Sequence, residues 1–191
     1  MNRSSFAPLL AAGIVFLLAF TAPTAPRKLI ADKAKSVMTY TMRHPMHTWD
    51  GVSHDVQSVL VYNDLTDRIE AVAVAAKIAS FDSQNANRDS HTIEVVEGLK
   101  YPRVTFTSTR IDQAGDKLNI RGNLSFHGVT KPVIIDGIRA DKGDWLVATG
   151  EFPVKMSEYN VERPSLMMVP TEESFILKFS LFYSKAAVQN Q

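Results

Sequence analysis

The apolar and polar side chains of this chain alternate with a period of two residues over long stretches. In residues 117–126 (KLNIRGNLSF), Leu118, Ile120, Leu124 and Phe126 fall on one face, and charged or amide side chains fall on the other. Because successive side chains of a strand point to opposite faces, this pattern predicts strands with one buried and one wetted side. Residues 174–183 (SFILKFSLFY) repeat the pattern, so we expect a mainly β fold.

Six further segments alternate in the same way or are apolar enough to form strands. They are residues 37–42, 57–63, 68–81, 101–110, 131–140 and 145–154. Polar turns at 114–117 and 141–144 connect neighbouring strands, and a corner at 127–132 contains Gly128, which allows a sharp bend. About eight strands at hairpin spacing require a sheet that closes into a barrel or folds into a sandwich.

Several positions on the expected inner faces carry small side chains. The small inward candidates are Ala71, Ala73, Ala75, Gly122, Gly137 and Ala148. The interior of an eight-stranded barrel is either just filled by side chains or holds one small ligand. Small inward residues leave volume unfilled, and an unfilled apolar volume loses dispersion contacts unless a ligand occupies it. The sequence therefore favours a barrel with some internal space.

The N-terminus resembles an export signal. Arg3 precedes an apolar run from Phe6 to Phe20, and small residues follow. The run is shorter than the roughly 20 apolar residues that a membrane span needs. Ala22 and Ala25 are the natural cleavage positions, but a proline follows each. Both a cleaved signal peptide and an uncleaved anchor therefore stay open, and in either case we expect a periplasmic or secreted folded part.

The domain organisation follows from these observations. Length and composition favour one domain. We expect a signal peptide or uncleaved anchor at 1–26, a linker at 27–35, a barrel domain at 36–184 and a flexible tail at 185–191.

Composition excludes several classes of function. The chain has no cysteine, which rules out disulfides, thiol catalysis and Cys-ligated metal centres. A net charge of +1 gives no support to a nucleic-acid-binding surface. No glycine-rich phosphate loop, dinucleotide fingerprint or GxSxG elbow is present. We therefore expect no cofactor and no nucleic-acid partner.

The histidines of the segment RHPMHTWDGVSH permit a metal site. His44 and His47 have an H-x-x-H spacing, and Asp50 and His54 follow closely. On a regular strand, residues three apart point to opposite faces, although Pro45 makes a loop plausible. The other interpretation places His44 on the face of the preceding apolar residues, where it donates a hydrogen bond at the barrel rim.

A second polar cluster lies at residues 82–91. Asp89 and His91 could orient one another for base catalysis, but no activated nucleophile accompanies them. The structural alternative is a charged clasp across the barrel, in which Arg88 pairs with Asp89 or Asp82. Asn85 and Asn87 suit turns.

Three stretches resemble the YceI-like family. They are SFDSQNANRDSH at 80–91, YPRVTFTST at 101–109 and GNLSFHGVTKPV at 122–133, which occur in the family's order. The resemblance extends over roughly residues 36–184. The chain departs from the family pattern after His91, where TIEVVEGLKYP replaces a Leu-rich segment.

The resemblance implies an all-β fold, an eight-stranded antiparallel lipocalin-like barrel with one or two short helices. The sequence places candidate helices around 90–97 and within 155–166. The resemblance also implies an exported, non-enzymatic carrier that holds a polyisoprenoid, an isoprenoid quinone or a similar lipid inside the barrel. Transient membrane contact and a homodimer are further expectations.

The candidate ligand-binding residues form two groups. The resemblance implies that Arg88, Asp89 and His91 lie near the mouth or in the loop that braces it, and His44 is a second candidate. Polar groups at the mouth would select the head group of the ligand. The expected wall residues are Met38, Tyr40, Met42, Phe106, Leu118, Ile120, Leu124, Phe126, Phe175, Leu177 and Phe179.

Two other functions stay open. A metal-dependent or hydrolytic enzyme would use the histidine and aspartate cluster. A ligand-free envelope stress or interaction module would have a barrel that its own side chains fill.

Overall fold

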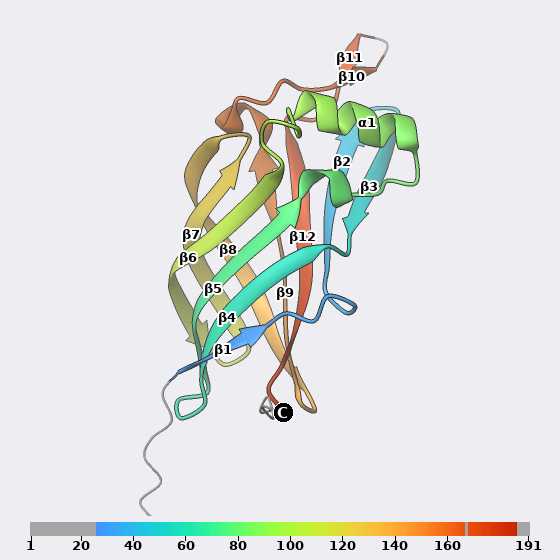
Figure 1. Cartoon of the computed structure of the whole chain (residues 1–191). Coiled ribbons are helices and arrows are strands. Elements are labelled where there is room, and N and C mark those ends of the chain that lie inside the picture. The colour runs from blue at the N-terminus through green and yellow to red at the C-terminus, as the bar shows by residue number, and fades with distance from the viewer. Residues whose placement is uncertain (1–25, 167, 187–191) are drawn as a thin grey trace, which may run out of the picture.

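A computed structural model describes residues 26–166 and 168–186, and most of this part of the chain is a single curled antiparallel sheet (Figure 1). The sheet has ten strands in the order β1-β4-β5-β6-β7-β8-β9-β12-β2-β3. The eight expected strands are all present, and β1 and β3 are additional. The elements in chain order are β1 (Arg27–Ile30), β2 (Val37–His44), β3 (His47–Ser53), β4 (Val56–Asn63), β5 (Arg68–Lys77), η1 (Ile78–Ser80), α1 (Ala86–Val95), β6 (Arg103–Ala114), β7 (Lys117–Phe126), β8 (Val129–Lys142), β9 (Trp145–Lys155), η2 (Met156–Tyr159), β10 (Ser165–Leu166), β11 (Val169–Pro170) and β12 (Ser174–Ser184).

Each free edge of the sheet is held to another part of the chain by isolated contacts instead of a continuous ladder. After β1, Ala31 forms an antiparallel bridge with Tyr183 of β12. The Tyr183 hydroxyl also lies 2.6 Å from Ser58 Oγ on β4. On the other edge, Val52 of β3 exchanges two backbone hydrogen bonds of 2.9 Å with Asp82. These contacts close the curled sheet into an incomplete barrel.

Residues 27–35 differ from the linker that the sequence predicts. β1 pairs with β4, from Arg27 opposite Tyr62 to Ile30 opposite Val59. Only Leu29 of this strand is buried, so four residues give too little alternation to reveal it. The described part of the expected tail begins with Lys185, whose amide bonds the Asp144 carbonyl. The expected signal or anchor falls outside the described residues except for Pro26.

The connection from β7 to β8 is tighter than the expected corner at 127–132. His127 and Gly128 both have positive φ, 50° and 73°, and β8 begins at Val129. Two consecutive positive φ values are typical of the two-residue hairpin turn whose twist matches a sheet. A Cβ atom on Gly128 would lie 2.5 Å from the Tyr101 ring, so this position needs glycine for both reasons.

Most inner faces match the predicted alternation, but the face of β5 was predicted wrongly. Ile69 is buried at the start of this strand, which would place Ala71, Ala73 and Ala75 inside. The pairing of β4 with β5 shifts between Val61 and Tyr62, as at a β-bulge. The shift reverses the facing. Ala73 is therefore exposed, and the valines on either side of it line an internal cavity.

The first helix begins earlier than predicted. α1 starts at Ala86, and the Asn85 side chain caps it by accepting a hydrogen bond from the Arg88 amide. Asn85 is therefore a helix cap and not an ordinary turn residue. Figure 1 shows α1 across one end of the barrel, beside the β2–β3 turn. Within the described chain, no helix is long and apolar enough to cross a membrane.

Candidate ligand-binding site

A cavity of about 280 Å³ lies between α1 and the barrel interior. We call it the α1 chamber. Side chains from β2, β3, β6, β7, β9 and β12 form its walls, α1 covers it, and the segment from Met156 to Thr171 borders it. A second cavity of about 60 Å³, the inner chamber, lies deeper in the barrel. Both linings are almost entirely apolar.

All of the expected wall residues line one or both chambers. Tyr40, Met42, Phe126 and Phe175 line the α1 chamber alone. Leu124 and Leu177 line both chambers. Met38, Phe106, Leu118, Ile120 and Phe179 line the inner chamber and not the α1 chamber.

Three of the four expected mouth residues line the α1 chamber. They are His44, Arg88 and His91. Asp89 does not line it; its carboxylate accepts a hydrogen bond from the Ser83 amide, 3.1 Å away. The expected clasp between Arg88 and Asp89 or Asp82 does not form among the described residues. The Arg88 guanidinium instead lies 5.0 Å from the centre of the Trp49 ring, a cation–π contact.

His44 connects the β2 end to the β10–β11 hairpin. Its Nδ1 accepts a hydrogen bond from the Met46 amide, so its Nε2 carries the proton and donates to the Val169 carbonyl, 3.0 Å away. The side chain is buried. His44 therefore holds one border of the chamber in its neutral form.

The polar groups of the α1 chamber share one electrostatic character. Its lining includes Arg88 and three histidines, but no carboxylate. Burial raises the pKa of Tyr40, which keeps its phenol protonated. Tyr40 OH, Trp49 Nε1 and Thr171 Oγ1 are buried without a hydrogen-bond partner in the described chain. The chamber is therefore an apolar space bordered by hydrogen-bond donors and by the Arg88 cation.

The geometry gives no support to the metal and triad interpretations. Across the described residues, no three His, Cys, Asp or Glu side chains come close enough together to hold a metal ion. His44 and His47 face each other across the β2–β3 pairing, with ring centres 5.6 Å apart. His91 contacts Glu94 and not Asp89, at 3.5 Å.

Sequence reasoning missed part of the helical lining. Thr92, Val95 and Val96 face the chamber together with the expected Arg88, from α1 and the residue after it. Their spacing of i, i+4, i+7 and i+8 is the signature of one helix face. An earlier helix start, recognised from the Asn85 cap, would have revealed it. Trp49, Val154 and Met156 were also missed.

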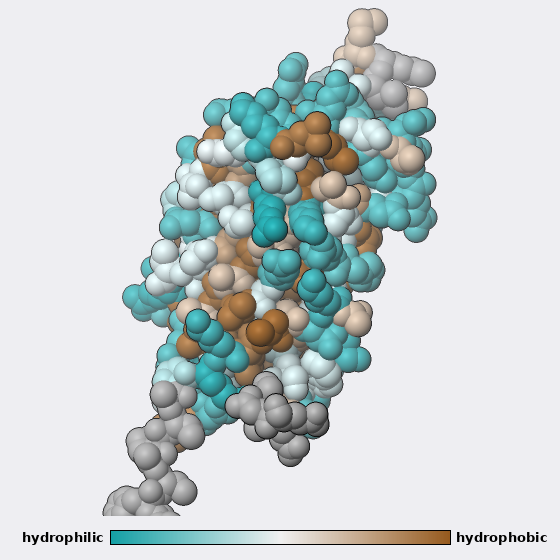
Figure 2. All heavy atoms as spheres, viewed as in Figure 1, coloured by the Kyte–Doolittle hydropathy of each residue, from teal (hydrophilic) through white to brown (hydrophobic). Residues whose placement is uncertain are grey.

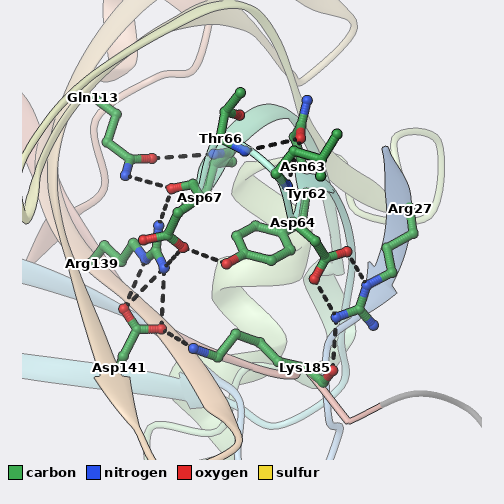
Figure 3. Close-up of polar contacts among 12 residues, drawn as sticks. Arg27, Tyr62, Asn63, Asp64, Thr66, Asp67, Gln113, Arg139, Asp141 and Lys185 are labelled. Atoms are coloured by element: carbon green, nitrogen blue, oxygen red, sulfur yellow. Dashed lines mark hydrogen bonds and ion pairs between the residues drawn. The ribbon is translucent and has the colours of Figure 1, made fainter. Parts of the chain in front are cut away.

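The opposite end of the barrel is sealed by charges (Figure 3). Arg139 points into the barrel from β8 and is 5% exposed. Its guanidinium lies 2.6 Å from the Asp67 carboxylate and 3.0 Å from that of Asp141. Lys185 Nζ lies 2.6 Å from Asp141, and Arg27 donates to the Lys185 carbonyl. We call Arg27, Asp67, Arg139, Asp141 and Lys185 the base network.

A sequence model of the YceI-like domain matches residues 30–181. The chain belongs to the YceI-like family. It is 28% identical over 150 residues to Protein YceI of Salmonella newport, an alignment that covers 74% of this chain and 78% of that protein.

Solved structures show the same YceI-like fold. BcnA of Burkholderia cenocepacia superposes with a TM-score of 0.72 at 22% identity, over 80% of this chain and 98% of BcnA. A polyisoprenoid binding domain from Saccharophagus degradans, implicated in plant cell wall breakdown, gives 0.64 at 11% identity, over 84% and 99%. At these identities the likeness concerns the fold.

The YceI-like motifs meet at the end of the barrel that α1 covers. The Tyr101 ring packs on Gly128 and lies edge-on to His127, with ring centres 5.0 Å apart. His127 Nδ1 lies 2.9 Å from the Tyr159 carbonyl oxygen of η2. Its Nε2 lies 2.9 Å from the Glu97 carboxylate, at an angle too bent for a hydrogen bond. The three motifs thus both anchor the segments that border the chamber and supply part of its lining, which includes Phe81, Arg88, His91, Val104, Leu124 and Phe126.

Proposed function

We propose that the protein is an exported carrier that binds the hydrocarbon part of a polyisoprenoid, an isoprenoid quinone or a similar lipid in the α1 chamber. The observation that carries this proposal is the apolar space of about 280 Å³. It is nearly twice the roughly 150 Å³ of an apolar cavity known to bind benzene. The proposal includes no catalytic step.

The apolar lining of the chamber supports a hydrocarbon ligand. A hydrocarbon chain placed there would contribute about 0.8 kcal/mol for each methylene group removed from water.

The polar border supports a ligand whose head group accepts hydrogen bonds. Arg88 and His91 lie at the chamber, and no carboxylate accompanies them in its lining. A quinone carbonyl, an alcohol or a phosphate would match such donors. The polyisoprenoid binding domain of Saccharophagus degradans, which shares the fold, supports the same class of ligand.

The two ends of the barrel support entry at the α1 end. The base network is charged and would exclude a hydrocarbon chain. At the other end, Met46 of the β2–β3 turn is 65% exposed, and Met168 of the β10–β11 hairpin is 97% exposed. Figure 2 shows hydrophobic surface beside α1, and a second area along β1 and β4. We propose that the α1 end touches a membrane transiently during loading.

Lipid analysis with a matched pair of helix variants tests the proposal. Thr92 faces the chamber from α1, whereas Ser90 is exposed on the same helix. Thr92→Trp should reduce co-purified or reloaded prenyl lipid at least tenfold because the indole occupies the ligand volume. Ser90→Trp should load as the wild type does. The measurement is mass spectrometry of lipid extracted from each purified protein. Wild-type protein that yields no prenyl lipid, even after incubation with one, would refute the function.

A further inference from the structure

The α1 chamber and the inner chamber adjoin at a small set of shared side chains. Val104, Leu124 and Leu177 line both cavities. We propose that these three residues form a partition that limits how much of a hydrocarbon chain the barrel accepts. This inference rests on the proposed function and specifies its ligand.

The partition is built from opposite walls of the barrel. Val104 lies on β6, and Leu124 on β7 is paired with Phe106 of β6. Leu177 lies on β12, which β8 and β9 separate from β7 in the sheet order. Leu124 and Leu177 thus belong to strands that are not neighbours, and both lie at the boundary of the two cavities. Both are buried, at 2% and 6% exposure.

The strands fix the partition in place. Leu177 is paired with Tyr40 of β2 on one side and with Phe152 of β9 on the other. Leu124 is paired with Phe106 and with Lys131 of β8. Because both leucines are paired with a neighbouring strand on each side, their backbones cannot withdraw without breaking the sheet. Only side-chain rotation could open a passage.

The volumes set the length of chain that fits above the partition. A cavity of roughly 150 Å³ holds one six-carbon ring, so 280 Å³ holds about ten to twelve carbons. This corresponds to two isoprene units. The rest of a longer tail would stay outside the α1 end. The inner chamber, at about 60 Å³, adds little unless the partition is removed.

Ligand affinity should therefore depend on chain length in a specific way. Each methylene group that enters an apolar chamber raises affinity about fourfold. For the wild type, affinity should rise with chain length until the chamber is filled at about ten carbons. It should then change less than threefold between the prenyl alcohols geraniol (C10), farnesol (C15) and geranylgeraniol (C20).

Two leucine-to-alanine variants test the partition. Leu124→Ala joins the chambers, whereas Leu146→Ala removes the same atoms at a buried residue of β9, 0% exposed, that lines neither chamber. Leu124→Ala should bind farnesol at least tenfold more tightly than geraniol. Leu146→Ala should keep the wild-type profile. Leu124→Val provides a milder opening if the alanine variant does not fold.

Competition against a fluorescent fatty-acid probe gives the affinities, and circular dichroism checks the fold. A wild type that already gains tenfold from geraniol to farnesol would overturn the partition while leaving the carrier function intact. An equal shift in both alanine variants would also overturn it. Absence of binding of all three alcohols to the wild type would overturn the proposed function and the partition together.

Discussion

The base network gives a prediction in which the effect of a substitution depends on which partner is removed. Arg139 is 5% exposed, whereas the side chains of Asp67 and Asp141 are 67% and 41% exposed. Removing the guanidinium leaves carboxylates that water can reach. Removing both carboxylate charges leaves a cation in a place that water cannot reach.

The magnitudes follow from this asymmetry. Arg139→Met keeps much of the packing and removes the cost of burying the charge, so it should lower the free energy of unfolding by about 1–2 kcal/mol. The double variant Asp67→Asn with Asp141→Asn keeps the shapes of both side chains but leaves the guanidinium without a counter-charge. Its loss should be about 3–5 kcal/mol, the range for breaking a buried ion pair.

Urea unfolding followed by circular dichroism measures both losses at pH 7. The Asp141→Asn single variant should lie between them because Asp67 still contacts Arg139, at 2.6 Å. The reasoning would be refuted if Arg139→Met destabilised the protein more than the double asparagine variant. That order would mean that the guanidinium acts mainly as a packing group.

Three further outcomes are expected. Hydrogen bonds from Tyr62 and Arg139 lower the pKa of Asp67. Asp67 therefore contributes fully to the free energy of unfolding above its ordinary pKa of about 3.9, and this contribution is lost as the pH falls below that value. In urea titrations between pH 5 and 2, the free energy of unfolding of Arg139→Met should fall less steeply than that of the wild type. Asn85→Ala removes the cap of α1 and should lower the unfolding free energy by about 1 kcal/mol, and Asn85→Ser should restore most of it. Met168→Asp should weaken co-sedimentation with phosphatidylcholine vesicles at least threefold, whereas Ile134→Asp, at a residue 61% exposed on β8, should not; equal losses would count against contact through the α1 end.

Alternation was sufficient to predict the strands because each long strand has one buried face. β7 illustrates this, since its buried residues recur at every second position from Leu118 to Phe126. The wall candidates chosen from this alternation all line one or both of the two chambers. Periodicity failed where the register shifts, as in β5, because a bulge changes facing without changing composition.

The covering segments were harder to predict for a different reason. After Ala86, α1 continues with polar residues from Asn87 to Thr92, so no apolar period marks where the helix begins. β3 is an edge strand, and β1 is a strand of four residues. The burial of their side chains depends on which residues pack against these two edges of the sheet. Arg88 lines the chamber, but its stacking on Trp49 depends on a tertiary contact that local sequence does not encode.

The cap over the chamber has a consequence for how the protein would respond to its load. No residue of α1 is fully buried, although Arg88, Thr92 and Val95 face the cavity. The inner side of the helix therefore borders the chamber where most amphipathic helices meet a packed core. A bound ligand would pack against this side of the helix, so ligand binding and the packing of α1 on the barrel would be coupled. The ligand-bound protein would expose a well-ordered α1 at its surface, and the ligand-free protein a less ordered one. The outer surface of the barrel would therefore differ between the two states.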